Sequence, residues 1–110
     1  MIESGAIQEI YAKSNNGHIA ELGRRFRDYR VALRLTQKDV SDRSGVSVMT
    51  IVRFENGSGG AIRLDKLVAL LRAVQLLEEV EDLVPEIPSS LYERNEIKHP
   101  QRVKLRKDEK

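Results

Sequence analysis

The chain has 110 residues, 33% of them charged, and a net charge of +2. A chain of this length has room for one hydrophobic core, so we expect one small domain with extensions. Cysteine is absent, which excludes a disulfide framework, a thiolate zinc site and a cysteine nucleophile and fits a reducing cytosol. The start MIESGAIQEI lacks a signal-peptide pattern, and no apolar run reaches bilayer length, which predicts a soluble, cytoplasmic protein without a membrane partner.

The N-terminal part of the chain, residues 1–17, is predicted to be an extension. Within it Ile7, Ile10 and Tyr11 mark a short amphipathic segment, and the pattern does not decide between helix and strand. The run Asn15-Asn16-Gly17 predicts a turn that ends this segment.

A first helix of the domain is predicted from about residue 19 to residue 34. Apolar residues recur there at steps of three and four, which is typical of one face of a helix, and the other face is rich in arginine. The apolar positions are Ile19, Leu22, Phe26, Tyr29 and Leu33. They predict a single apolar face along this helix.

The next segment, TQKDVSDRSGVSVMTIVRFENG, contains the signals for two capped helices joined by a glycine turn. The hydroxyl of Thr36 can cap a helix, and Asp39, three places on, completes a capping box. The second helix therefore begins near Gln37. It ends at Gly45, because glycine most easily takes the left-handed conformation that turns the chain sharply.

A third helix follows Ser47, which is the second predicted N-cap. Ile51 and Phe54 stand three places apart and so share its inner face, and the pair Asn56-Gly57 closes it. Two helices of about eight to ten residues joined by a short turn match the helix-turn-helix motif, whose second helix lies in the DNA major groove. An ordinary helical hairpin is the alternative.

The motif residues stand in the register of a known family. They are an arginine in the first helix, Thr-Gln at the start of the second, Gly45-Val46-Ser47 at the turn, and Ile51, Phe54, Glu55, Asn56 and Gly57 in and after the third. In this pattern the chain resembles the lambda-repressor/Cro-like helix-turn-helix family, also called the Xre family, over about residues 19–77. The resemblance implies an all-α fold in which five helices form the DNA-binding domain, residues 18–84.

A loop, Ser58-Gly59-Gly60, separates the motif from a predicted fourth helix. The apolar stripe of that helix consists of Leu64, Leu67, Val68, Leu71 and Val74. A shorter fifth helix is predicted around residues 78–84, and Pro85 and Pro88 stop it. The remainder, residues 85–110, is predicted to be a Pro-flanked extension with a basic end.

One polar pair is expected to be structural. Arg30 lies near the apolar face of the first helix, and the resemblance implies that such an arginine pairs with the acidic residue that Glu55 matches. We predict a partly buried ion pair between these two side chains. The alternative is two solvated charges, which would interact by about 0 to 1 kcal/mol.

DNA contact is expected to begin with phosphates, which supply affinity and register rather than sequence reading. The resemblance implies that Gln37, Ser47 and the backbone near Asn56 fill this role, because helix N-termini and free amides favour anions. Gln37 could equally be an ordinary residue of a first helical turn.

Base reading is expected from the outward side chains of the third helix. These are Val48, Met49, Thr50, Val52 and Arg53. The family often has Arg, Gln or Ser where Val48 and Met49 stand, so the residues that would form bidentate hydrogen bonds are missing. Our hypothesis is that Val48 and Met49 contact thymine methyl groups while Arg53 contacts guanine or a phosphate, which predicts thymine-rich half-sites. A small apolar patch for a protein partner is the competing interpretation.

Charge is distributed unevenly along the chain. Residues 18–57 carry a net charge of +3, residues 58–97 one of −4, and residues 98–110 one of +4. This asymmetry suits a protein with one face toward phosphates, although a helical protein rich in Arg and Lys can show it by chance. The basic tail either lies along DNA or is a solvated segment that aids solubility.

Enzyme chemistry has little support. The two histidines, His18 and His99, lie at opposite ends of the chain beside flexible sequence. The acidic run Glu78, Glu79, Glu81 and Asp82 alternates with leucine and valine at helical spacing, which predicts a solvated helix face rather than a metal site. We therefore predict no enzymatic activity, no cofactor and no metal.

A homodimer on double-stranded DNA is expected, because one helix-turn-helix unit contacts only one half-site. The candidate contact residues are Leu76, Leu77, Val80, Leu83 and Val84, although the same side chains could instead close the core of the monomer. The predicted function is that of a sequence-specific transcriptional regulator, and more narrowly a repressor.

An alternative function comes from the region between Leu70 and Pro88. Its leucine-rich helix, acidic segment and Pro-flanked exit to a basic tail are similar to those of HipB-like antitoxins. That similarity implies a protein that binds a kinase-like toxin and represses its own operon. A neighbouring toxin-kinase gene would favour this alternative.

Overall fold

The computed structural model of the protein describes residues 4–58 and 60–93, and within these ranges it contains helices and no strand. The helices are α1 (Ser4–Ala12), α2 (Asn15–Ala32), α3 (Gln37–Ser44), α4 (Val48–Asn56), α5 (Leu64–Ala73), the 3₁₀ helix η1 (Leu77–Glu79), α6 (Val80–Leu83) and α7 (Ser89–Glu93). The predicted all-α fold is confirmed, and α2 to α6 supply the helices expected of the domain. The basic tail, residues 98–110, lies outside the described residues.

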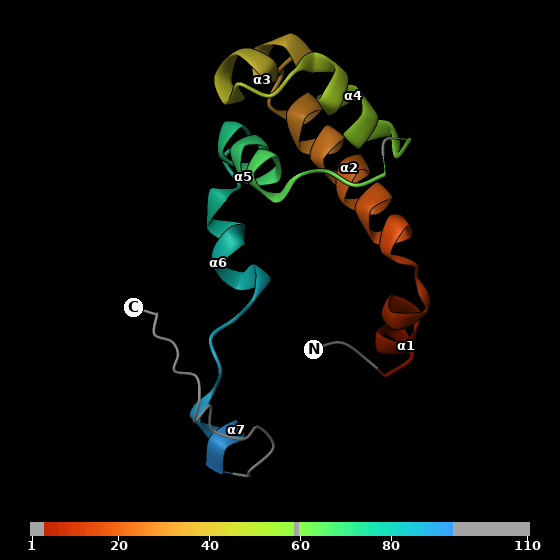
Figure 1. Ribbon diagram of the computed structural model, residues 1–110, viewed down its shortest axis with the longest axis vertical. Coiled ribbons are helices and arrows are strands. Elements are labelled where there is room, and N and C mark those ends of the chain that lie inside the picture. Colours follow the sequence, from red (N-terminus) through yellow and green to blue (C-terminus); the bar gives the residue numbers. More distant parts are fainter. Residues whose placement is uncertain (1–3, 59, 94–110) are drawn as a thin grey trace.

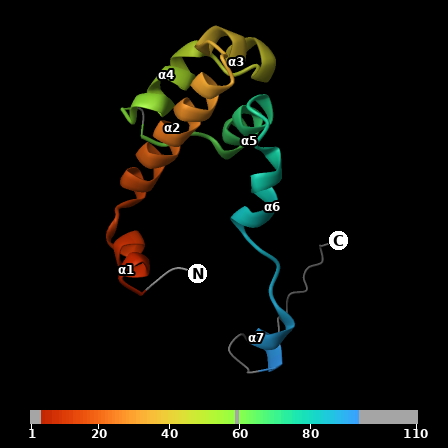
Figure 2. The same cartoon turned by 180° about the vertical axis from the view of Figure 1, so that it is seen from behind.

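The helices form an arch, which Figures 1 and 2 show from opposite sides. The antiparallel pair α2 and α4 and the adjoining α3 make its top, and α2 continues down one arm toward α1. The second arm consists of α5, η1 and α6. The arch therefore places the helix-turn-helix segment at one end of the molecule and both chain-terminal helices at the other.

The hydrophobic core lies beneath the top of the arch. Its buried members are Phe26, Val40, Val46, Ile51, Phe54, Leu70, Ala73 and Val74. The rings of Phe26 and Phe54 are tilted against each other with centroids 5.6 Å apart, a favourable aromatic geometry. Because these residues come from α2 to α5, one core fixes the orientation of α3 and α4 relative to the rest of the domain.

The first domain helix begins earlier than its apolar pattern predicts. The turn predicted at Asn15-Asn16-Gly17 is wrong, because these residues form the first turn of α2. Ser14 is the cause: its hydroxyl accepts a hydrogen bond from the Gly17 amide at 2.9 Å and so caps the helix. The segment before it, whose type the sequence left open, is the helix α1.

The apolar face predicted for this helix is only partly buried. Phe26 lies in the core, whereas Leu22, Tyr29 and Leu33 are exposed. The closest approach of α2 to α4 is instead at Gly23, where an added Cβ would lie 1.8 Å from the carbonyl oxygen of Phe54. The absence of a side chain at this position lets α2 and α4 approach backbone to backbone.

The core face of α5 is rotated relative to the predicted stripe. Leu70, which the stripe omits, is fully buried together with Val74, whereas Leu64 is mostly exposed. Several apolar residues in this helix satisfy a three- and four-residue spacing, so the pattern alone does not fix which of them face the core.

The predicted fifth helix corresponds to η1 and α6, which end before Pro85. Beyond Pro88, in the predicted extension whose conformation the sequence left open, the chain forms a further short helix, α7 (Ser89–Glu93). Proline here follows its usual pattern, because it cannot continue a helix but is tolerated just before or at the start of one.

Candidate nucleic-acid interface

The start of α3 is built by reciprocal capping. The amide of Asp39 donates to the Thr36 hydroxyl at 2.9 Å, and the amide of Thr36 donates to the Asp39 carboxylate at 2.8 Å. The pKa of Asp39 is lowered, mainly because its ionised carboxylate accepts the Thr36 backbone hydrogen bond. The predicted capping box is confirmed, and it fixes where α3 begins.

The turn between α3 and α4 is equally well defined. Gly45 has a φ of 78°, the left-handed conformation predicted for it, and Val46 is buried directly after it. Ser47 then caps α4, accepting a hydrogen bond from the Thr50 amide at 3.1 Å. At its other end α4 stops at Gly57, which is also left-handed with a φ of 74°. Both ends of α4 are therefore set by local backbone chemistry.

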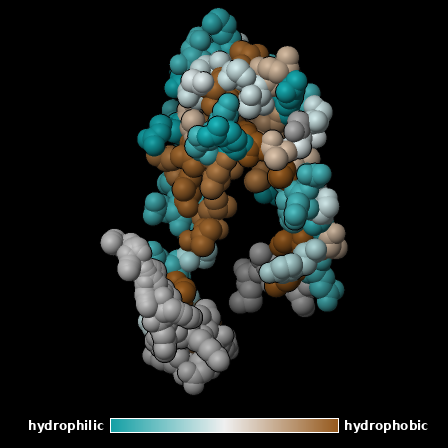
Figure 3. Space-filling view, viewed as in Figure 1, coloured by the Kyte–Doolittle hydropathy of each residue, from teal (hydrophilic) through white to brown (hydrophobic). Residues whose placement is uncertain are grey.

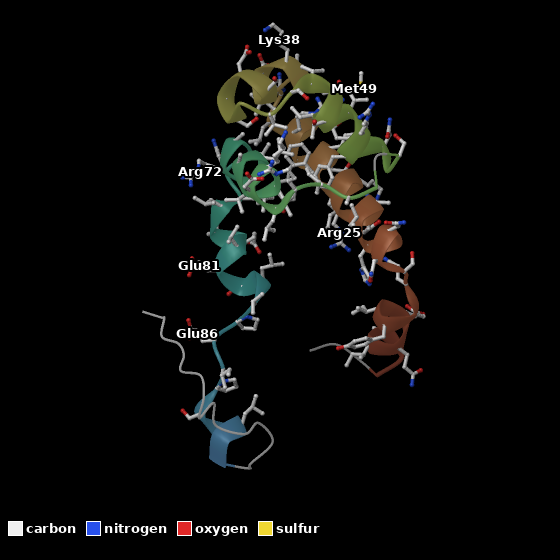
Figure 4. All side chains as sticks on the ribbon, in the orientation of Figure 1. Arg25, Lys38, Met49, Arg72, Glu81 and Glu86 are labelled. Carbon is white, nitrogen blue, oxygen red and sulfur yellow. The ribbon has the colours of Figure 1, made fainter. Side chains whose placement is uncertain are left out.

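The helix α4 has a buried and an outward face. Ile51, Phe54 and Glu55 are buried, and at 100° per residue the opposite side of the helix centres on Met49 and Arg53. Met49 is 57% exposed, and Figure 4 shows its side chain directed away from the body of the protein. A side chain in this position is free to meet another molecule.

The residues predicted to read bases are not equally accessible. Val48, Met49 and Arg53 are exposed, and Thr50 and Val52 are half-buried on the flanks of the outward face. Asn56 is also exposed at the end of α4, where its side chain accepts hydrogen bonds from the amide and hydroxyl of Ser58.

Behind α4 lies the pair formed by Arg30 and Glu55. The Nε of Arg30 donates to one carboxylate oxygen of Glu55 at 2.6 Å, and its Nη2 donates to the other at 2.8 Å. The two side chains are only 11% and 3% exposed, respectively. The Glu55 hydrogen bond raises the pKa of Arg30. This bidentate, largely buried contact joins α2 to the inner face of α4.

The same network holds the first residue of α3. The side-chain amide of Gln37 donates to Glu55 at 3.1 Å, and Arg30 also donates to the backbone carbonyl of Leu35 at 2.9 Å. Glu55 thus accepts hydrogen bonds from side chains of two helices, α2 and α3. Gln37, predicted to contact a phosphate, is half-buried with its amide nitrogen turned inward, so a phosphate would meet its remaining N–H or its backbone.

Sequence reasoning did not single out the cations that surround this end of the molecule. Arg34, Lys38 and Arg43 are exposed on or beside α3, and Lys38 points outward at the top of the arch (Figure 4). Lys38 also contacts Asp42 at 3.3 Å, so α3 presents mixed charge rather than a continuous basic patch. The signal for Lys38 and Arg43 was in the sequence, as a Lys and an Arg at solvent-facing positions of the second helix, and Arg34 lies shortly before that helix.

Within residues 4–58 and 60–93, no group of three or more acidic or histidine side chains is arranged to hold a metal ion. Over the same ranges, no helix combines the length and the apolar character needed to cross a bilayer.

The geometry defines the class of protein: two short capped helices, a left-handed glycine turn and an outward-facing second helix constitute a helix-turn-helix DNA-binding unit. Comparison with known families agrees. Residues 21–84, more than half of the chain, match the family described as helix-turn-helix domain, and the chain belongs to that family. Comparison with curated proteins gives no match.

Proposed function

We propose that this protein is a sequence-specific transcriptional regulator, and more narrowly a repressor of the Xre type, that places α4 in the major groove of double-stranded DNA. The observation that carries this proposal is the division of α4 into a buried face held by Ile51, Phe54 and Glu55 and an outward face centred on Met49 and Arg53. A helix anchored on one side and free on the other meets the requirement for reading base edges.

The chemistry of the outward face favours a particular kind of site. Val48 and Met49 supply apolar surface and no hydrogen-bond donor, so they suit the methyl group of thymine. Arg53 supplies a fork of donors for guanine or a phosphate. We propose half-sites rich in thymine, with phosphate contacts from Gln37, Ser47 and the backbone near Asn56, and flanking contacts from Lys38 and Arg43.

The test is selection of bound sequences from a random DNA pool, followed by titration of the selected duplex. Substitution Arg53→Ala is expected to weaken binding by about 5- to 150-fold, which corresponds to about 1–3 kcal/mol, if Arg53 reads guanine. If it contacts a phosphate instead, the salt dependence of binding falls by about one unit. Arg72→Ala is the matched control, because Arg72 is an exposed arginine on α5, away from α4 (Figure 4).

Each outcome separates parts of the proposal. Recovery of half-sites containing only guanine and cytosine would reject methyl reading by Val48 and Met49. Equal losses in the Arg53 and Arg72 variants would reject α4 as the reading helix. No binding at low ionic strength would reject DNA as the partner.

We further propose that the regulator acts as a dimer of its domain, residues 18–84, flanked by the extensions 1–17 and 85–110. Among the candidate contact residues, Leu76, Leu77 and Val80 are half-buried and Leu83 and Val84 are exposed. Two copies place two reading helices about one DNA turn apart, which a single copy cannot do.

A second candidate function is that of a HipB-like antitoxin that binds a kinase-like toxin and represses its own operon. The exposure of Leu83 and Val84, at 60% and 83%, favours it because both belong to the leucine- and valine-rich arm that resembles those proteins. Co-purification with a kinase-sized protein encoded beside this gene is the test, and purification of this chain alone from its native host would count against it.

A further inference from the structure

The connection between α2 and α3, residues 33–36, contains an arginine in an unfavourable backbone conformation. Arg34 has a φ of 60°, in the left-handed region that glycine adopts without steric cost and that other residues rarely adopt. At the ends of α3 and α4 the chain has glycine in this conformation, Gly45 with a φ of 78° and Gly57 with a φ of 74°. An arginine therefore occupies a position where glycine would favour the fold.

Hydrogen bonds hold the backbone on both sides of Arg34. Its own amide donates to the carbonyl of Val31 at 2.9 Å, and the amide of Leu35 donates to the carbonyl of Arg30 at 3.1 Å. These two bonds form a Schellman motif, which ends α2 and requires the left-handed residue. The Nη1 of Arg30 also donates to the carbonyl of Leu35 at 2.9 Å, so the connection is tied to the buried ion pair.

Gln75, just after α5, has the same backbone arrangement without a charge. Its φ is 67°, its amide donates to the carbonyl of Arg72 at 3.2 Å, and the amide of Leu76 donates to the carbonyl of Leu71 at 2.8 Å. The left-handed conformation alone therefore does not identify a function. Charge and position distinguish Arg34 from Gln75.

The charge of Arg34 is exposed. Over residues 4–58 and 60–93 no carboxylate forms an ion pair with it, whereas Arg24, Arg25 and Arg30 of α2 each contact an acidic side chain. Figure 3 shows hydrophilic residues over the top of the arch, where α3 lies. A cation without an acid beside it makes the potential at this end of the molecule more positive.

Arg34 belongs to the same end of the molecule as the proposed DNA contacts. The connection between α2 and α3 is at the top of the arch (Figure 1), where the side chains of Lys38 and Met49 point away from the protein (Figure 4). Arg34 precedes Gln37 by three residues, a chain distance of at most about 10 Å. Successive phosphates of one DNA strand advance by about 3.4 Å along the helix axis. The spacing of the two side chains therefore suits neighbouring phosphates of one strand.

We infer that Arg34 binds a DNA phosphate, next to the phosphate proposed for Gln37 on the same strand. This inference rests on the proposed function and adds a residue to the same site. A guanidinium presents a planar fork of donors that matches phosphate oxygens. The fixed backbone limits the positions from which Arg34 reaches the strand, so less freedom is lost on binding. The contact supplies affinity and register without reading sequence.

The main experiment compares Arg34→Gly with the wild type by fluorescence anisotropy titration of the duplex selected from the random pool, over a range of salt concentrations. Loss of one phosphate contact is expected to reduce the slope of log K against log[salt] by about 0.9, which corresponds to roughly eightfold weaker binding at about 0.1 M salt. The same ratio is expected on an unrelated duplex, because phosphate contacts do not depend on sequence.

The same substitution is expected to stabilise the protein in the absence of DNA. Glycine relieves the left-handed strain, so the midpoint of thermal unfolding should rise by about 4 °C. Greater stability together with weaker DNA binding is the result expected of a residue whose side chain contacts DNA. A residue that only ends α2 would show the gain in stability without the loss of binding.

Three matched variants separate the effect of charge from that of the backbone. Arg34→Gln removes the charge but keeps the strained conformation, and is expected to reduce the salt slope as much as Arg34→Gly without the gain in stability. Gln75→Gly relieves the same conformation at the end of α5, and is expected to gain stability with unchanged DNA binding. Arg72→Gln removes an exposed arginine of α5 and is expected to leave the salt slope unchanged.

The outcomes distinguish a failure of this inference from a failure of the proposed function. No binding of wild type to any duplex at low ionic strength would overturn both. Wild-type affinity and slope in Arg34→Gly and Arg34→Gln would overturn the Arg34 contact and leave reading by α4 in place. An equal fall in slope for Arg72→Gln would reveal a general effect of charge and would also overturn the contact. Weaker binding confined to the selected duplex would mean that Arg34 contacts a base, which overturns the phosphate assignment.

Discussion

The helix-turn-helix end of the molecule and its two arms hold their side chains in different ways. At the top of the arch, α3 and α4 begin and end at capped positions and pack on a core in which Val40 and Ile51 have no exposed surface. In the arms, Ile10, Tyr29 and Leu83 are at least 42% exposed. The top is complete within one chain, whereas the arms have apolar surface to cover.

This difference matches the roles that we propose for the two regions. A reading helix must meet base edges at fixed positions, and a rigid first layer of side chains needs a rigid support behind it. The buried Arg30–Glu55–Gln37 network provides such a support for α4. A surface for a second copy instead has to stay accessible until that copy arrives, so its apolar side chains remain at the solvent boundary in one chain.

The largest effect on stability is expected from substitutions that break the ion pair behind α4. Glu55→Ala leaves the guanidinium of Arg30 largely buried without its carboxylate, which is expected to lower the free energy of unfolding by about 3–5 kcal/mol. Arg30→Ala should cost a similar amount, and the double variant much less than the sum. Urea unfolding of the four proteins of this double-mutant cycle measures the coupling. A coupling near zero would mean that the two charges act as independent surface groups.

A second variant tests the close approach of α2 and α4. Gly23→Ala would place a Cβ 1.8 Å from the Phe54 carbonyl oxygen, so the two helices must separate, and we expect a loss of about 3 kcal/mol. Gly5→Ala is the control: Gly5 lies in α1 with no atom near its potential Cβ, and the change should stabilise that helix by about 0.5–1 kcal/mol. Thermal unfolding of both variants measures the difference, and equal small effects would contradict the tight α2–α4 contact.

Sequence reasoning succeeded where the determinants are local. The capping box of Thr36 and Asp39, the left-handed Gly45 and the N-cap Ser47 each depend on residues within three positions, and all of them are confirmed. The separation of the outward from the inward side chains of α4 follows from the helical repeat alone once Ile51 and Phe54 are assigned to the core.

The sequence did not predict the features that depend on how two helices pack against each other. Nothing near Gly23 in the sequence reveals that the backbone of α4 passes beside it. Which face of α5 turns toward the core, with Leu70 buried, depends on the helices that α5 packs against. Within the candidate site, the hydrogen bond from Gln37 to Glu55 joins residues 18 positions apart and follows only from the packed arrangement of α3 and α4. The early start of α2 is different, because the Ser14 cap is a local signal that was overlooked.

The smallest expected effect concerns the exposed surface of α2 and depends on pH. Glu21 accepts hydrogen bonds from Arg24, at 2.7 Å, and from Arg25, at 3.0 Å, and these bonds lower its pKa from 4.5 to about 2. Because the pKa is lower in the folded protein, the ionised carboxylate stabilises the fold above pH 4.5, and this contribution is lost as the pH falls to about 2. The arginines are more than half exposed, so solvent screening keeps the contribution small.

Thermal unfolding between pH 4.5 and pH 2 is therefore expected to be less steeply pH-dependent in Glu21→Gln than in the wild type. The control is Glu81→Gln, which makes the same change in net charge at an exposed position in α6, for which the described part of the chain shows no ion pair. High salt should reduce the difference between Glu21→Gln and the wild type, since it screens exposed charges. Parallel curves for all three proteins at low salt would show that the Glu21 contacts contribute nothing to folding.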